Sequence, residues 1–152
     1  MLNPQLSDLV QAMKDSGKHI TIETSGIAYV SDLPCDLMSI SPKLGNSVPQ
    51  DKKLRELHDD SRLDLAILGE LIEHYDYQLK FVIENDNDIA EIEDILKRLG
   101  KADYEKVMLM PQASTRQELL EKSPMVAELC KRTGFAFSQR LQVLLWNNKK
   151  GS

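Results

Sequence analysis

Short strand patterns alternate with amphipathic helix patterns along nearly all of this 152-residue chain. Strands are predicted at residues 19–23, 37–40, 78–83 and 107–110. Helices are predicted at residues 6–13, 63–72, 88–99 and 115–132. Such alternation requires right-handed crossovers and produces a mostly parallel sheet. The pattern therefore predicts one α/β domain over residues 1–152.

Several element ends carry their own signals. Ser16 and Gly17 close the first helix, and Gly100 closes the helix that begins near Asp88. Asp88 is predicted as the N-cap of that helix, with Glu91 completing a capping box. The run 81–83 predicts a strand buried on both faces. The longest irregular stretch is predicted at 44–56, and extended segments are predicted at 135–137 and 141–146.

Charge and hydropathy exclude several classes of protein. A formal net charge of -5 argues against a nucleic-acid surface, which needs clustered cations. No apolar run reaches the ~20 residues that a membrane-spanning helix requires. The first residues lack the basic and apolar regions of a secretory signal. A cytoplasmic protein with no nucleic-acid or membrane partner is therefore expected.

The two cysteines, Cys35 and Cys130, are too far apart in sequence to form a local metal motif. Nothing near Cys35 is expected to lower its pKa, and Cys130 falls within an apolar helix pattern. The histidines have no metal-ligand spacing either. No metal site is predicted within this chain.

Polar residues follow the predicted strands at the ends where parallel α/β sheets bind ligands. The strand 37–40 runs directly into Ser41-Pro42-Lys43, and the strand 19–23 into Thr24-Ser25-Gly26. The loop after Met110 belongs to the same predicted edge. A hydroxyl, a rigid turn and a cation suit an anionic or polar ligand. No phosphate-binding glycine loop or nucleophile motif accompanies them.

The strand 78–83 contains a lysine, which is costly in an apolar strand unless it extends to solvent or pairs. Alternation places Gln78 and Lys80 on one face and Leu79 and Phe81 on the other. Gln78 and Lys80 are therefore expected either to be satisfied internally or to meet a ligand. Glu23, at the end of the first strand, is either a surface residue or part of that same site.

Several segments together resemble the 7-carboxy-7-deazaguanine synthases, radical S-adenosylmethionine enzymes of queuosine biosynthesis. They occur in the family's order over nearly the whole chain, at residues 20–26, 35–44, 46–47, 77–82, 109–112, 134–141 and 144–146. The resemblance implies the C-terminal portion of a partial (β/α) barrel. It also implies conversion of 6-carboxy-5,6,7,8-tetrahydropterin to 7-carboxy-7-deazaguanine with loss of ammonia. The family uses S-adenosylmethionine, a [4Fe-4S] cluster and Mg²⁺.

The resemblance also implies roles for individual residues. Those expected to bind S-adenosylmethionine are Ser41, Pro42, Lys43, Gln78, Leu79, Lys80 and Phe81. Those expected to face the pterin substrate are Glu23, Thr24 and Gly26. Gln142 stands where the family pattern leads us to expect a histidine.

The family's C-x3-C-x2-C and Gly-Gly-Glu-Pro motifs lie upstream of the segment that matches residues 2–5. The chain alone is therefore expected to be inactive. One hypothesis is that it is the carboxy-terminal part of a synthase: a fragment, the product of a mis-started reading frame, or a split-enzyme subunit completed by an N-terminal half. The alternative is a non-catalytic α/β module that binds a nucleotide-like ligand or acts as a dimerisation partner. A homodimer is possible in either case.

Overall fold

The computed structural model describes residues 5–47, 62–147 and 149. Five parallel strands form one sheet in the order of the sequence. They are β1 (Thr21–Thr24), β2 (Leu37–Ile40), β3 (Tyr77–Ile83), β4 (Val107–Pro111) and β5 (Ala136–Phe137). The predicted α/β class and parallel pairing are confirmed. In the described residues the sheet is open, with β1 and β5 at its edges.

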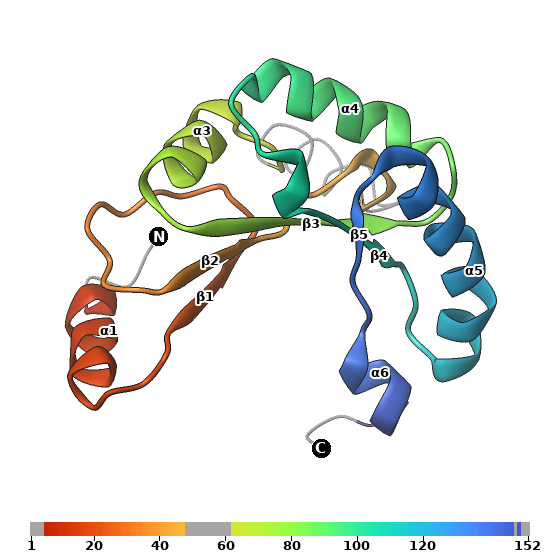
Figure 1. The fold of residues 1–152 in the computed structure, drawn as a ribbon. Coiled ribbons are helices and arrows are strands. Elements are labelled where there is room, and N and C mark those ends of the chain that lie inside the picture. Colours follow the sequence, from red (N-terminus) through yellow and green to blue (C-terminus); the bar gives the residue numbers. More distant parts are fainter. Residues whose placement is uncertain (1–4, 48–61, 148, 150–152) are drawn as a thin grey trace, which may run out of the picture.

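The helices are α1 (Leu6–Asp15), α3 (Leu65–His74), α4 (Asp88–Leu99), α5 (Arg116–Thr133) and α6 (Leu141–Trp146). Two short 3-10 turns, η1 (Gly45–Ser47) and η2 (Tyr104–Lys106), precede α3 and β4. Figure 1 shows α3 and α4 over one side of the sheet and α5 beside β4 and β5. Helices α1 and α6 lie near the two ends of the sheet. No helix among the described residues is long and apolar enough to cross a membrane.

Strand β3 divides the molecule into an apolar side and a polar side. Its odd-numbered residues are buried on the side of the helices, and Leu79, Phe81 and Ile83 are fully buried. Gln78, Lys80 and Val82 alternate with them and are only partly buried. The predicted alternation of Gln78 and Lys80 with Leu79 and Phe81 is therefore confirmed. Burial of the strand on both faces, which the run 81–83 suggested, is wrong because Val82 faces the polar side.

Most predicted elements are found within a few residues of their expected bounds. The exception is 141–146, predicted as extended, which forms helix α6. Val143 is its buried residue and packs with Ala113 and Leu119 in a small core separate from the main one. This segment is only six residues long, so its apolar pattern did not distinguish helix from strand. Of the irregular stretch 44–56, the part from 48 onward lies outside the described residues.

The predicted capping box at Asp88 is also wrong. Asn87 is the N-cap, and Asp88 is the first residue of α4. The buried carboxylate of Asp88 accepts hydrogen bonds from the backbone N–H groups of Glu84 (2.7 Å) and Asn85 (3.1 Å) in the preceding turn. A capping box does form at α5, between Thr115 and Glu118.

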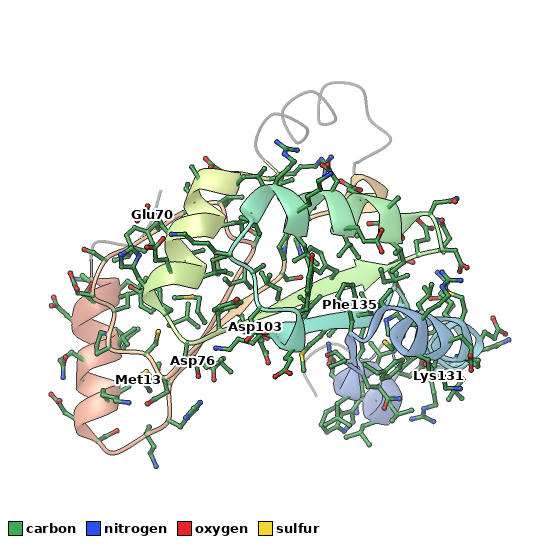
Figure 2. The ribbon with its side chains drawn as sticks, turned by 45° about the horizontal axis from the view of Figure 1, so that its top comes forward. Met13, Glu70, Asp76, Asp103, Lys131 and Phe135 are labelled. Atoms are coloured by element: carbon green, nitrogen blue, oxygen red, sulfur yellow. The ribbon has the colours of Figure 1, made fainter. Side chains whose placement is uncertain are left out.

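At the amino ends of the strands, side chains tie neighbouring elements together. The Tyr77 hydroxyl accepts a hydrogen bond from the backbone N–H of Asp103 at 2.8 Å. Lys106 pairs with Asp76 at 2.6 Å, and its ammonium lies 4.8 Å from the centre of the Tyr77 ring. Figure 2 shows Asp76 and Asp103 at this end of the sheet. These contacts hold the amino ends of β3 and β4 together. The predicted ligand edge lies at the opposite, carboxyl ends of the strands.

We expect Gly26→Ala to destabilise the chain because the site lacks both the backbone freedom and the space for a side chain. Gly26 has φ +80°, and an added Cβ would lie 2.3 Å from Leu68 Cδ2 and 3.1 Å from Ile40 Cγ2. We expect the free energy of unfolding, measured by urea denaturation, to fall by about 2–4 kcal/mol relative to the parent.

Gly17→Ala is the matched control because its φ is +73° but no atom lies within 4 Å of the added Cβ. It should cost only the backbone strain, about 1–2 kcal/mol. Equal losses in the two variants would contradict packing as the reason for Gly26.

Acid should weaken the attachment of α1 to the sheet through Asp36. Its carboxylate pairs with Lys14 and accepts a hydrogen bond from Ile20 N–H at 2.7 Å. The hydrogen bond from Lys14, and then that from Ile20, lower the pKa of Asp36 below its usual 3.8. The carboxylate therefore stabilises the fold above about pH 4, and this contribution is lost as pH falls through the lowered pKa.

Asp36→Asn should flatten the fall in the free energy of unfolding as the pH drops below about 4. Lys14→Met should flatten it as well, because Lys14 is the main cause of the shift. Urea unfolding measured across this pH range tests both variants. A pH dependence identical to that of the parent chain would contradict the assignment.

Candidate functional site

The carboxyl ends of the strands open onto one cleft of about 510 Å³ on the polar side of the sheet. Strands β1 to β4 and the segment after β5 all contribute to its lining. The lining residues are Glu23, Thr24, Ser25, Ser39, Ser41, Lys43, Lys80, Val82, Met110, Arg140 and Gln142. The ligand edge predicted from the strand ends is therefore a continuous surface in the folded chain.

An ion pair crosses the floor of the cleft from β1 to β3. Lys80 Nζ lies 2.9 Å from Glu23 Oε1, and the Lys80 side chain is 16% exposed while that of Glu23 is 76% exposed. The intervening β2 contributes Ser39, whose hydroxyl accepts a hydrogen bond from Gln78 Nε2 at 3.0 Å. Lys80 is thus paired within the protein and largely buried, whereas most of the Glu23 side chain remains accessible to a ligand.

The segment after β2, residues 41–47, forms one wall of the cleft and is called here the cleft loop. Its first residue is tied to β1 by a hydrogen bond from Ser41 N–H to the Thr24 carbonyl, 2.8 Å long. Pro42 and Leu44 are buried, whereas Ser41 and Lys43 are partly exposed and line the cleft. Within the described ranges, no hydrogen bond or ion pair occupies the Lys43 ammonium.

Not all the predicted site residues reach the cleft. The side chains of Leu79 and Phe81 are fully buried on the opposite face of β3, so only their backbone can contribute on the cleft side. Gly26 is buried against Leu68 and Ile40 and does not line the cleft. Pro42 is buried and borders a smaller hollow of about 140 Å³ instead of the cleft. The remaining predicted residues lie on the polar side, where Glu23, Thr24, Ser41, Lys43 and Lys80 line the cleft. Gln78 does not line it and bonds to Ser39 instead.

Two lining residues come from the tail of the chain, which sequence reasoning did not place at the site. Arg140 precedes α6, and its Nη1 donates a 2.5 Å hydrogen bond to the Ala113 carbonyl in the segment after β4. Gln142 lies in the first turn of α6. They were missed because 141–146 was predicted as a strand. The available signal was the strand-end rule applied to β5, which ends at Phe137.

The cleft is electropositive although the chain is acidic. Its lining contains three cationic side chains, Lys43, Lys80 and Arg140, and one carboxylate, Glu23. The formal net charge of the whole chain is -5, so the cleft has the opposite sign of charge from the chain as a whole. Hydroxyls of Ser25, Ser39 and Ser41 supply hydrogen-bonding groups beside them. This arrangement suits a polar ligand that bears an anionic group.

The cysteines do not fit an iron–sulfur cluster. Cys130 is buried and Cys35 is half-buried, and neither lines the cleft. Desolvation raises the pKa of both thiols, which disfavours the thiolate form that binds iron. Among the described residues, no group of three His, Cys, Asp or Glu side chains could hold a metal ion.

No family model and no solved structure matches the chain. Curated proteins do match. A 7-carboxy-7-deazaguanine synthase of Halobacterium salinarum is 38% identical over 152 residues, covering 92% of this chain and 59% of the relative. The synthase of Rhodopirellula baltica is 30% identical over 148 residues, covering 95% of this chain and 57% of the relative. That of Pyrobaculum aerophilum is 27% identical over 154 residues, covering 96% of this chain and 60% of the relative.

The aligned regions take in nearly all of this chain, and therefore the cleft-lining residues of the strands and the loops that follow them. The chain spans somewhat less than two thirds of the length of these relatives. Over that part of their length, the chain is homologous to the 7-carboxy-7-deazaguanine synthases.

Proposed function

We propose that the chain supplies the part of a 7-carboxy-7-deazaguanine synthase in which S-adenosylmethionine and a pterin substrate lie across the strand ends. The observation that carries this proposal is the cationic, hydroxyl-lined cleft in a chain homologous to those synthases. The sequential, all-parallel strand order suits a partial (β/α) barrel whose polar side is the interior. The reaction proposed for the complete enzyme is conversion of 6-carboxy-5,6,7,8-tetrahydropterin to 7-carboxy-7-deazaguanine with loss of ammonia.

Four of the lining residues and two core residues behind them have chemical tasks in this proposal. The Lys43 ammonium in the cleft lining binds the carboxylate of S-adenosylmethionine, and Ser41 donates a hydrogen bond beside it. Lys80 is held in place by Glu23 and keeps a positive charge on the cleft floor. The exposed part of the Glu23 carboxylate accepts hydrogen bonds from the N–H groups of the pterin. Leu79 and Phe81 support the strand from the core side.

Reductive cleavage of S-adenosylmethionine requires an electron from an iron–sulfur cluster, and the two cysteines of this chain do not provide its ligands. In the proposal, the cluster belongs to a part of the enzyme that is not represented in this sequence. This chain contributes binding and orientation. The second candidate function is a non-catalytic module that binds a nucleotide-like ligand. The absence of cluster ligands among the two cysteines also fits this function. Such a module would need no partner chain.

We expect the purified chain to bind S-adenosylmethionine weakly and Lys43→Ala to bind it about tenfold more weakly still. The reason is the loss of one hydrogen bond to a charged group. Isothermal titration calorimetry measures both affinities. The matched control is Lys131→Ala on α5 (Figure 2), whose side chain is 72% exposed and outside the cleft.

The control should bind like the parent. Equal affinities of Lys43→Ala and the parent would remove the role assigned to Lys43. A parent chain that does not bind S-adenosylmethionine at all would count against the proposed function.

Anaerobic reconstitution with iron and sulfide should leave the chain without a cluster, because its thiols are separated and desolvated. Absorbance spectroscopy and an iron assay measure this. A stable brown protein with about four irons per chain would contradict the proposal that the cluster ligands lie elsewhere.

A further inference from the structure

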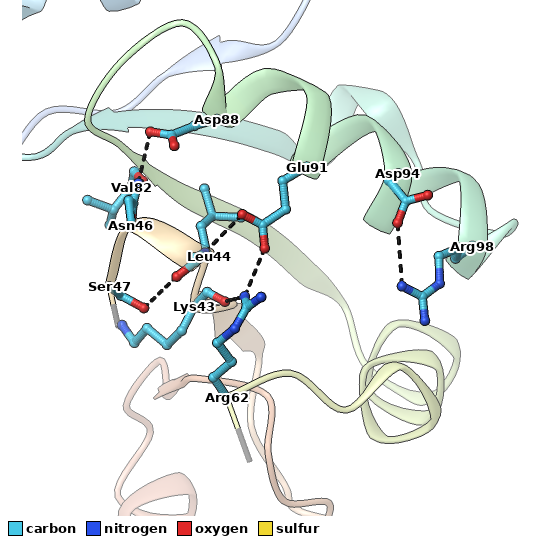
Figure 3. Close-up of polar contacts among 11 residues, drawn as sticks. Lys43, Leu44, Asn46, Ser47, Arg62, Val82, Asp88, Glu91, Asp94 and Arg98 are labelled. Carbon is cyan, nitrogen blue, oxygen red and sulfur yellow. Dashed lines mark hydrogen bonds and ion pairs between the residues drawn. The ribbon is translucent and has the colours of Figure 1, made fainter. Parts of the chain in front are cut away.

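The cleft loop is held from behind by the first turn of α4. Figure 3 shows two carboxylates of that helix, Asp88 and Glu91, facing the loop. They are three residues apart and therefore lie on one face of the helix. Each of them bonds to a different part of the loop.

Glu91 holds the middle of the loop in two ways. Its Oε2 accepts a hydrogen bond from Gly45 N–H at 2.9 Å. Its Oε1 accepts one from Arg62 Nη1 at 2.8 Å, and the same nitrogen donates to the Lys43 carbonyl at 2.8 Å. One guanidinium nitrogen therefore bridges the carboxylate of α4 to the backbone of the residue that presents its ammonium to the cleft. The Arg62 side chain is 19% exposed and that of Glu91 is 30% exposed.

Asp88 holds the end of the loop through Asn46. The Asn46 amide Nδ2 donates to Asp88 Oδ2 at 2.9 Å and to the Val82 carbonyl of β3 at 3.0 Å. Val82 lines the cleft on the strand side. Because this same carboxylate also orders the β3–α4 turn, its removal would disturb the fold as well as the loop. Glu91 is therefore the cleaner point at which to test the loop alone.

We propose that Glu91 and Arg62 are positioning residues for the cleft ligand, which they affect by fixing the backbone of Lys43. This inference rests on the proposed function, since the ligand used to test it is S-adenosylmethionine. Neither residue lines the cleft. The bonds engage the carbonyl of Lys43 and the amide of Gly45, so the Lys43 side chain keeps its donors for the ligand.

The arrangement explains why a loop can act as a precise part of the site. On either side of Lys43, Pro42 is buried and Leu44 belongs to the hydrophobic core. The Arg62 bond sets the carbonyl between those two residues. Such ordering before binding lowers the entropy that a ligand must remove when it binds.

A double-mutant cycle with calorimetry tests whether Glu91 acts through Lys43. Glu91→Ala should weaken S-adenosylmethionine binding about tenfold, as expected for groups in one hydrogen-bond network. Arg62→Met should do the same, while Arg62→Lys should stay within about threefold of the parent because an ammonium can donate to both oxygens. In the Lys43→Ala background, Glu91→Ala should cause little further loss.

The matched control is Asp94→Ala, on the same helix. Asp94 pairs with Arg98 at 3.4 Å and has no contact with the loop (Figure 3). It should leave the affinity unchanged. Losses that add fully in the double variant, or an equal loss in Asp94→Ala, would overturn the inference by showing a general effect on the fold.

Hydrogen exchange of peptides covering residues 41–47 measures the loop without any ligand. Glu91→Ala should speed exchange of these amides about tenfold, whereas Asp94→Ala should not. Unchanged exchange in Glu91→Ala overturns the inference. If the parent does not bind S-adenosylmethionine, the proposed function and the ligand effect both fall, and faster exchange would support only the positioning of the loop.

Discussion

The strict alternation of side chains along β3 is the constraint on which the rest of the structure depends. Leu79, Phe81 and Ile83 are completely buried, and this commits one face of the strand to the helices. A shift of one residue in register would place Lys80 in that core and expose three large apolar side chains. Hydrophobic burial on one face thus determines that the other face carries polar groups. The cleft is a consequence of the packing behind it.

The pairing order extends this division to the neighbouring strands. Glu23, Ser39 and Gln78 are register partners across β1, β2 and β3. Their side chains therefore share a face, on which the bond between Gln78 and Ser39 and the ion pair between Glu23 and Lys80 both lie. An exposed ion pair of this kind contributes little to stability. Its main effect here is to place a charge on the cleft floor at a defined position.

Homology to the synthases and the chemistry of the cleft are independent observations that support the same proposed function. The relatives are synthases that are considerably longer than this chain, and the match takes in nearly all of this chain. The structure adds that three cations from β3, the cleft loop and the tail meet at this surface. It also separates residues that act on the ligand side from those, such as Leu79 and Phe81, that act from the core.

The sequence alone determined the helix and strand order as far as residue 137, the parallel sheet and the edge at which polar residues collect. Periodic burial and strand-end position are local signals. It also placed Lys43 and Lys80 correctly on the polar side.

Tertiary structure decided what depends on distant contacts. Buried Val143 made 141–146 a helix, which brought Arg140 and Gln142 to the cleft. Asp88 accepts hydrogen bonds from backbone N–H groups of the preceding turn and does not cap the helix. Glu91 accepts hydrogen bonds from Gly45 and Arg62 and does not complete a capping box. Residues separated by 29 and 46 positions meet in those last two contacts, and no local pattern encodes such pairs.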